Sequence, residues 1–109
     1  MATIDDFARL DIRVGEVLQA EKFPKAKKPA YQLWIDFGLD IGVLKSSAQI
    51  TDLYHPEDLI GKQVLAVINF PPRQIADFMS QALVLGACTK DGVVLVHPAA
   101  NVEKGTPIH

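Results

Sequence analysis

The sequence has a single cysteine, no long apolar run and no large excess of charge of either sign. Cys88 has no partner for an internal disulfide, which fits a reducing compartment. No stretch approaches the roughly 20 apolar residues that a membrane-spanning helix needs. Residues 1–13 hold three aspartates and neither a basic start nor an apolar block, so we expect no signal or transit peptide. These absences predict a cytoplasmic protein that inserts into no membrane.

Signatures of catalysis and of metal binding are missing too. There is no Gly-rich phosphate loop, no nucleophile elbow and no paired-carboxylate segment with a candidate base nearby. His55, His97 and His109 share no ligand spacing. Cys88 ends an apolar strand, so we expect a buried small hydrophobe rather than a nucleophile. The sequence therefore predicts a binding module and not an enzyme, with no catalytic residue, no metal and no cofactor.

The composition is that of one ordinary globular domain. Of the 109 residues, 49% are hydrophobic and 22% are charged, which argues against disorder and supports one core. We expect a single domain over residues 1–109. The formal net charge of −2 offers no overall attraction to nucleic acid, so the distribution of charge matters more than its sum.

Apolar alternation predicts strands along most of the chain. Thr3 and Asp6 have the spacing of a capping box, which indicates a short amino-terminal helix. A long strand follows from residue 11, with a bulge or bend expected at Gly15, where the apolar parity changes. Residues 31–37 alternate cleanly and residues 41–47 pair back as a hairpin. Residues 51–62 indicate a loop or one helical turn.

Later strands are expected at residues 63–68, 82–87 and 93–96, and the tail from His97 allows only short edge pairing. This pattern predicts an all-β protein, a five-stranded oligonucleotide/oligosaccharide-binding (OB) barrel with a short amino-terminal helix and a small carboxy-terminal strand extension. In that fold, the loops between strands one and two and between strands four and five border the ligand face. Here these are residues 22–29, the lysine loop, and residues 69–81, so both are expected on the same side.

The lysine loop holds four of the eleven basic residues, and Lys25, Lys27 and Lys28 are the phosphate-binding candidates. A solvated loop whose lysines only maintain solubility is an equally open alternative.

Residues 69–81 are predicted to form a binding loop. Pro71 and Pro72 end the preceding strand and leave Arg73 exposed, suited to phosphate or carboxylate; an ion pair within the chain or a dimer is the alternative. Ser80 is a further candidate for nucleic-acid contact. An apolar grip on peptide is expected from Phe70, Phe78 and Met79, unless these side chains fold down into a small satellite core.

Four further residues are candidates for the ligand face. Trp34 lies opposite the apolar parity of its strand and can stack a base or grip a peptide side chain; burial under the amino-terminal helix or in a dimer is the alternative. Ser46, Ser47 and Gln49 end the third strand and can contact ribose, phosphate or peptide backbone, or else only close the barrel.

Several short motifs together resemble the tRNA-binding domain family over essentially the whole chain. In order they are Asp11-Ile12-Arg13-Val14-Gly15, Phe23-Pro24-Lys25-Ala26, Ser46-Ser47-Ala48-Gln49-Ile50, Gly61-Lys62-Gln63-Val64 and Asn69-Phe70-Pro71-Pro72-Arg73. The stand-alone length and the third and fifth motifs are most similar to the export-associated bacterial chaperones of that family. The resemblance implies a homodimer that binds unfolded or pre-export polypeptides, tRNA, or both.

The chain departs from the family pattern between strands four and five. The family usually has Gly at position 77, more basic character at positions 74 and 79 and Glu at position 81, where this chain has Asp77, Gln74, Met79 and Gln81. An acidic Asp77 weakens phosphate contact there. We therefore place the chaperone function first, with a stand-alone tRNA-binding protein as the alternative. The dimer contact is expected to use Phe7, Leu10 and residues 102–108.

Overall fold

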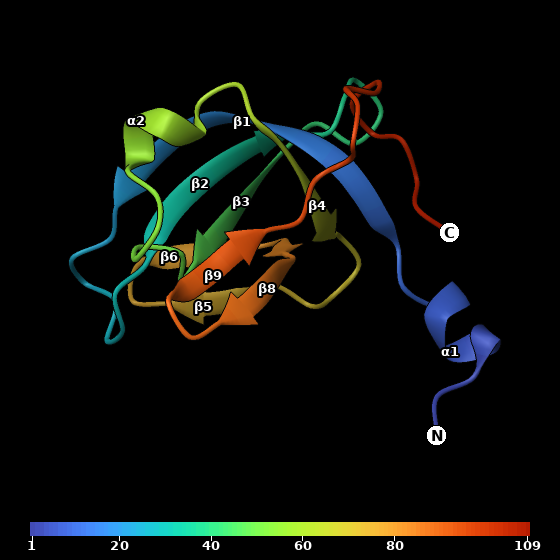
Figure 1. Ribbon diagram of the computed structural model, residues 1–109, viewed down its shortest axis with the longest axis horizontal. Coiled ribbons are helices and arrows are strands. Elements are labelled where there is room, and N and C mark those ends of the chain that lie inside the picture. Colours follow the sequence, from blue (N-terminus) through green and yellow to red (C-terminus); the bar gives the residue numbers. More distant parts are fainter.

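An antiparallel sheet of five strands, in the order β3-β2-β1-β4-β7, curls into a nearly closed barrel in the computed structural model, which describes residues 1–109 (Figure 1). Its strands are β1 (Ile12–Lys22), β2 (Tyr31–Asp36), β3 (Val43–Ala48), β4 (Gln63–Val67) and β7 (Leu83–Val84). Two hairpins are added, β5 (Arg73–Ile75) with β6 (Phe78–Ser80) and β8 (Gly86–Thr89) with β9 (Gly92–Leu95). The helices are α1 (Ile4–Ala8) and α2 (Pro56–Leu59). The predicted OB-type barrel is confirmed.

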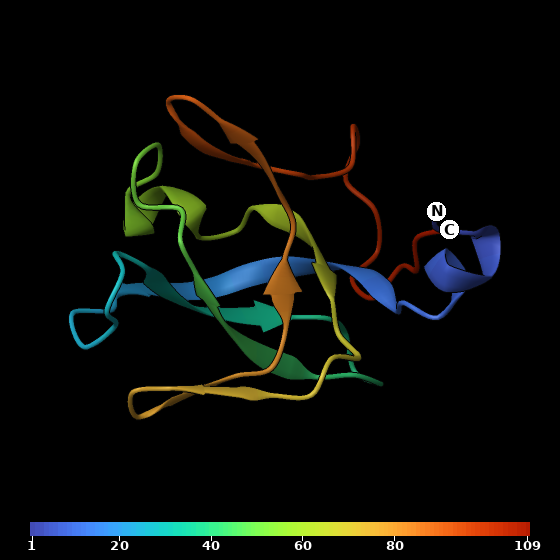
Figure 2. The same cartoon turned by 90° about the horizontal axis from the view of Figure 1, so that it is seen from below.

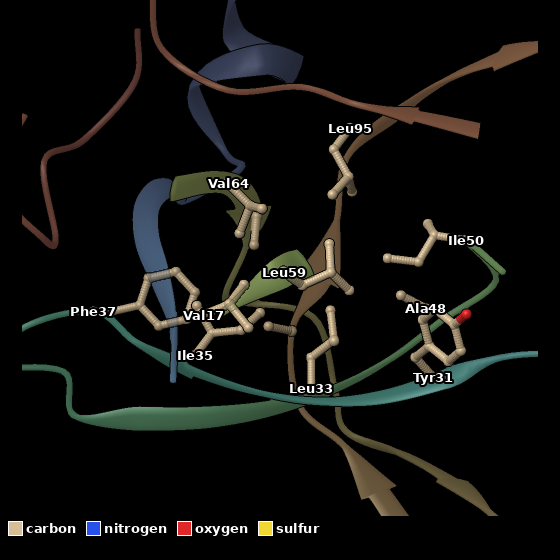
Figure 3. Packing of buried hydrophobic residues seen from close by; sticks show 12 residues of the cluster. Val17, Tyr31, Leu33, Ile35, Phe37, Ala48, Ile50, Leu59, Val64 and Leu95 are labelled. Atoms are coloured by element: carbon tan, nitrogen blue, oxygen red, sulfur yellow. The ribbon is translucent and has the colours of Figure 1, made fainter. Parts of the chain in front are cut away.

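The core lies inside the barrel because the strands alternate as predicted. In β2, Tyr31, Leu33 and Ile35 are buried, whereas the residues between them are half-buried. Helix α2 forms the single turn expected between β3 and β4, and Pro56 at its start fits because that position needs no N–H donor. Figure 3 shows Leu59 of this helix in the middle of the apolar cluster, where it is fully buried.

Strand β1 is long and bends, but not where the sequence indicated. The register against β2 shifts between Val17 and Gln19, so the bulge does not lie at Gly15. Gly15 serves close packing instead, since a Cβ there would lie 2.5 Å from Ile35 Cγ2 and 2.7 Å from Phe37 Cε1. The bulge thus lies beyond Val17, after the change of apolar parity that the sequence shows at Gly15.

The barrel closes where β3 meets the chain just after β6. The Lys45 carbonyl accepts hydrogen bonds from the N–H groups of Gln81 and Ala82, at 2.8 and 3.1 Å. Side chains complete this junction: Gln81 Oε1 accepts from Lys45 N at 2.9 Å, and Ser80 Oγ accepts from Ser47 N at 3.0 Å. The β5–β6 hairpin is thereby fixed to the barrel wall.

Helix α1 projects from the barrel at the end where both termini lie (Figures 1 and 2). The predicted capping box is present, with Thr3 and Asp6 bonding reciprocally, but the helix has no buried residue. Asn69 ties its exit to the barrel by accepting from Asp11 N and donating to the Arg9 carbonyl. The tail makes the expected short edge pairing with β1, at a bridge between Arg13 and Pro107 and through backbone hydrogen bonds of Gly105, Thr106 and Ile108. Neither helix is of a length and hydropathy that would allow it to cross a membrane.

Candidate ligand-binding cleft

The lysine loop and the β5–β6 hairpin lie side by side at one end of the barrel, opposite α1 and the termini (Figure 2). The prediction that both segments occupy one side is confirmed. Between them is an open cleft of about 500 Å³. It is lined by Lys25, Ala26, Lys27, Lys28, Ala30, Ser47, Gln49, Arg73, Gln74, Ile75 and Ala76.

Positive charge dominates this cleft. Lys27, Lys28 and Arg73 are exposed and belong to none of the ion pairs of the structure, so the intrachain pairing considered for Arg73 does not occur. The fourth cation, Lys25, places its Nζ 2.7 Å from Asp77 Oδ2. The hydrogen bond from Lys25 and its charge lower the pKa of the Asp77 carboxyl, and Asp77 in turn raises the pKa of Lys25.

The segment expected to be a loop is mostly a hairpin. Arg73 pairs with Ser80, Gln74 with Met79 and Ile75 with Phe78, so a tight turn is left at residues 76 and 77. Ala76 has φ 51° and is the only residue other than glycine with a positive φ. The sequence did not predict this hairpin, because tandem prolines argue against a strand. In the structure both prolines precede β5.

Under the hairpin lies a small aromatic cluster. Phe78 is buried, with its ring centroid 5.4 Å from that of Phe23 and 5.7 Å from that of Trp34. The ammonium of Lys45 lies 5.2 Å from the centroid of the Phe78 ring. The expectation of an exposed Phe78 is therefore wrong, and the satellite-core alternative describes it. Trp34 packs in this cluster and not beneath α1.

The other apolar candidates are exposed but separated. Met79 lies on the hairpin opposite Gln74. Phe70 borders a shallow depression with Asp6, Arg9 and Leu10 near α1, away from the cleft. The structure thus does not gather an apolar grip from these residues.

The polar candidates divide between the cleft and the wall. Ser47 and Gln49 line the cleft together with the cations. Ser46 faces the core with no exposed surface, and its Oγ has no hydrogen-bond partner, so it is not available to a ligand in this conformation. Ser80 Oγ accepts a hydrogen bond from Ser47 N, which occupies one of its acceptor sites. Gln74 lines the cleft because it belongs to β5. In the sequence it stood out only as a departure from the family pattern.

Cys88 is exposed on β8, which corrects the expectation that it is buried. The cause is that β8 lies in a two-stranded hairpin outside the main sheet, all four of its residues being exposed. No group of three or more His, Cys, Asp or Glu side chains is placed to hold a metal ion.

Comparison with known proteins places this geometry in a family. Residues 12–107 match the family described as "Putative tRNA binding domain". The structure is similar to that of the CsaA chaperone protein from Picrophilus torridus, with 51% identity, a TM-score of 0.95 and complete coverage of both chains. The chaperone CsaA from Bacillus anthracis gives 50% identity, a TM-score of 0.93 and coverage of 100% of this chain and 99% of the other.

The match to methionine–tRNA ligases covers only a small part of each enzyme. Methionine–tRNA ligase from Bacteroides fragilis is 41% identical over 105 residues, which cover 95% of this chain and 15% of the ligase. The chain thus spans about 15% of the length of such curated relatives. Likeness over both chains is found to the two CsaA chaperones and also to a MetRS related protein from Pyrococcus horikoshii, with 31% identity, a TM-score of 0.87 and coverage of 100% of this chain and 98% of the other. The chain therefore belongs to the tRNA-binding domain family and is similar over its full length to the CsaA chaperones.

Proposed function

We propose that this protein is a CsaA-like chaperone that holds unfolded or pre-export polypeptides, and that the cleft beside the lysine loop is its ligand site. The full-length likeness to two CsaA chaperones at about half identity carries this proposal. We further propose that the chain works as one domain in the cytoplasm, and that tRNA is a second ligand of the same cleft.

The cleft chemistry defines how a polypeptide would be held. Ser47, Gln49 and Gln74 offer hydroxyl and amide groups that can bond to an extended peptide backbone, and the cations can bind its carboxylates. Phe78 lies in the satellite core, so Met79 is the remaining apolar candidate on this hairpin. Holding would therefore depend mainly on charge and hydrogen bonds, with a modest apolar contribution.

A stand-alone tRNA-binding protein is the second candidate. Three cations without an anionic partner line one cleft, as a phosphate backbone requires, and the family description names tRNA. Ser80 also belongs to this proposed nucleic-acid surface, because its Oγ can still donate a hydrogen bond.

Titration of the purified protein with tRNA and with an unfolded preprotein, each over a series of salt concentrations, tests both candidates. Polypeptide binding at physiological salt, with competition by tRNA, is the result expected of the chaperone. Steep salt dependence for tRNA without any polypeptide binding would favour the second candidate instead. Binding of neither ligand would contradict both.

We also propose a homodimer formed through α1 and the carboxy-terminal tail. Ile4, Phe7 and Leu10 are exposed, and they line a depression together with the tail residues Pro107 and Ile108. A helix of five residues with no buried residue is marginal alone, so a second copy covering it would stabilise it. This surface lies opposite the cleft and leaves the ligand site open (Figure 2).

A further inference from the structure

One ion pair joins the two segments that border the cleft. Lys25 comes from the lysine loop and Asp77 from the tip of the β5–β6 hairpin, 52 residues later in the chain. Their side chains are 68% and 63% exposed, so water screens the pair and it contributes little to stability. Such a pair is better explained by its place at the cleft than by the fold.

Asp77 is a carboxylate placed where a ligand anion would bind. Of the four cations that line the cleft, only Lys25 has an anionic partner. A phosphate or carboxylate of a ligand can reach the Lys25 ammonium only by displacing Asp77 or by sharing the ammonium with it. The pair therefore reduces the attraction of the cleft for anions, most of all for a polyanion that uses every cation at once.

The backbone holds the carboxylate in this position. Ala76, directly before Asp77, has the left-handed φ of 51°, which is costly for a residue with a Cβ. The β5–β6 register leaves only residues 76 and 77 for the turn, and β6 is fastened to β3 through Ser80 and Gln81. The turn thus places Asp77 at the hairpin tip within reach of Lys25, with 2.7 Å between Oδ2 and Nζ.

We infer that Asp77 is a specificity-determining residue that competes internally for Lys25 and shifts the preference of the cleft from polyanionic nucleic acid toward polypeptide. This inference rests on the proposed function, because it concerns the choice between the two ligands of that cleft. An electrically neutral polypeptide gains little from a free Lys25, whereas a tRNA backbone gains one more phosphate contact.

Asp77→Asn tests the inference, with Asp40→Asn as the matched control. Asp40 is exposed in the connection between β2 and β3, and it has no ion-pair partner. Both variants change the net charge equally. We expect Asp77→Asn to tighten tRNA binding roughly five- to tenfold at about 0.1 M salt and to steepen the salt slope by about 0.7–0.9. Binding of a fluorescent unfolded polypeptide of zero net charge should change less than about twofold.

The same substitution in a Lys25→Gln background separates competition from a general charge effect. The gain in tRNA affinity should disappear there, because no ammonium remains to be released. An equal gain in that background, a gain no larger than that of Asp40→Asn, or an equal gain for the neutral polypeptide would overturn the inference.

Lys27→Gln/Lys28→Gln, measured in parallel, distinguishes failure of the inference about Asp77 from failure of the proposed ligand site. If that variant weakens both ligands while Asp77→Asn changes nothing, only the role of Asp77 is overturned. If neither variant alters either ligand, the cleft is not the site and both proposals are overturned.

Discussion

Phe78 and Met79 are neighbours in sequence with opposite environments. Phe78 packs between Phe23 and Trp34, whereas Met79 points outward. In a strand, alternate side chains face opposite sides, so one residue of such a pair must be inward. The sequence predicted apolar side chains at this segment, exposed or folded into a satellite core, but which residue faces inward depended on a hairpin register that the prolines obscured.

Replacing Phe78 with Ser should lower the free energy of unfolding by about 3 kcal/mol or more, because a buried ring is removed and a hydroxyl is left in its place. Met79→Ser, at an exposed position one residue away, should cost less than about 1 kcal/mol. Denaturant unfolding of both variants measures the difference. Equal costs would show that the satellite core does not depend on Phe78.

Ser46 and Ser80 provide a second contrast between residues of one type. Ser46 Oγ is buried without a partner, so Ser46→Ala removes an unsatisfied polar group and should leave stability unchanged or raise it by up to about 1 kcal/mol. Ser80→Ala removes the acceptor of Ser47 N and should lower stability by about 1 kcal/mol. Thermal unfolding checks both. A loss of ligand binding in Ser46→Ala with the fold intact would restore Ser46 as a site residue.

At the scale of elements, the strands with clear alternation were predictable and the irregular ones were not. Residues 31–37 and 63–68 alternate or stay apolar because each packs on the core, and the structure has β2 and β4 there. Residues 82–87 were expected to form one strand but divide into β7 and β8, since the chain leaves the main sheet at Leu85 for a separate hairpin. The lysine loop was predictable from its charge, and the cleft followed once the barrel type placed it beside the hairpin.

The stability of the end of β2 should depend on pH through Asp36. Its carboxylate accepts hydrogen bonds from Gly38 N at 2.9 Å and from Lys104 Nζ at 3.1 Å, and these lower its pKa, the Gly38 bond most. A carboxyl with a lowered folded-state pKa stabilises the fold above its unfolded value of about 3.9, and this contribution is lost as pH falls through the folded value. Part of the decline in stability below about pH 4 should therefore come from Asp36.

Asp36→Asn should lower stability near neutral pH by about 0.5–1 kcal/mol and flatten the acid limb of a plot of unfolding free energy against pH. Asp40→Asn, four residues later in the connection that follows β2, is the control and should leave that plot unchanged. An unaltered acid limb in Asp36→Asn would contradict the assignment.

For the whole molecule, the two ends of the barrel have different surfaces. One end carries the cations of the cleft, and the other carries α1, the tail and several exposed apolar side chains. This separation allows a dimer to form without covering the ligand site. It could not be deduced from composition, because the net charge of −2 averages over both ends.

The dimer is tested by sedimentation at micromolar concentration. We expect the wild-type chain to sediment as a dimer and Phe7→Ser/Leu10→Ser as a monomer with the barrel intact, since those side chains would lose their partner. Leu39→Ser, at an exposed apolar residue away from this surface, should remain dimeric. A wild-type monomer of ordinary stability would contradict the proposed contact.

Lys27→Gln/Lys28→Gln shows whether ligands bind in the cleft beside the lysine loop, because it removes two cations without disturbing an ion pair. Lys62→Gln/Lys90→Gln removes equal charge outside the cleft and is the control. The measurement is the salt dependence of tRNA affinity, followed by competition with an unfolded polypeptide. We predict a salt slope reduced by about 1.4–1.8 and weaker binding of both ligands in the first variant alone. The same slope in both variants and the wild type would contradict the account.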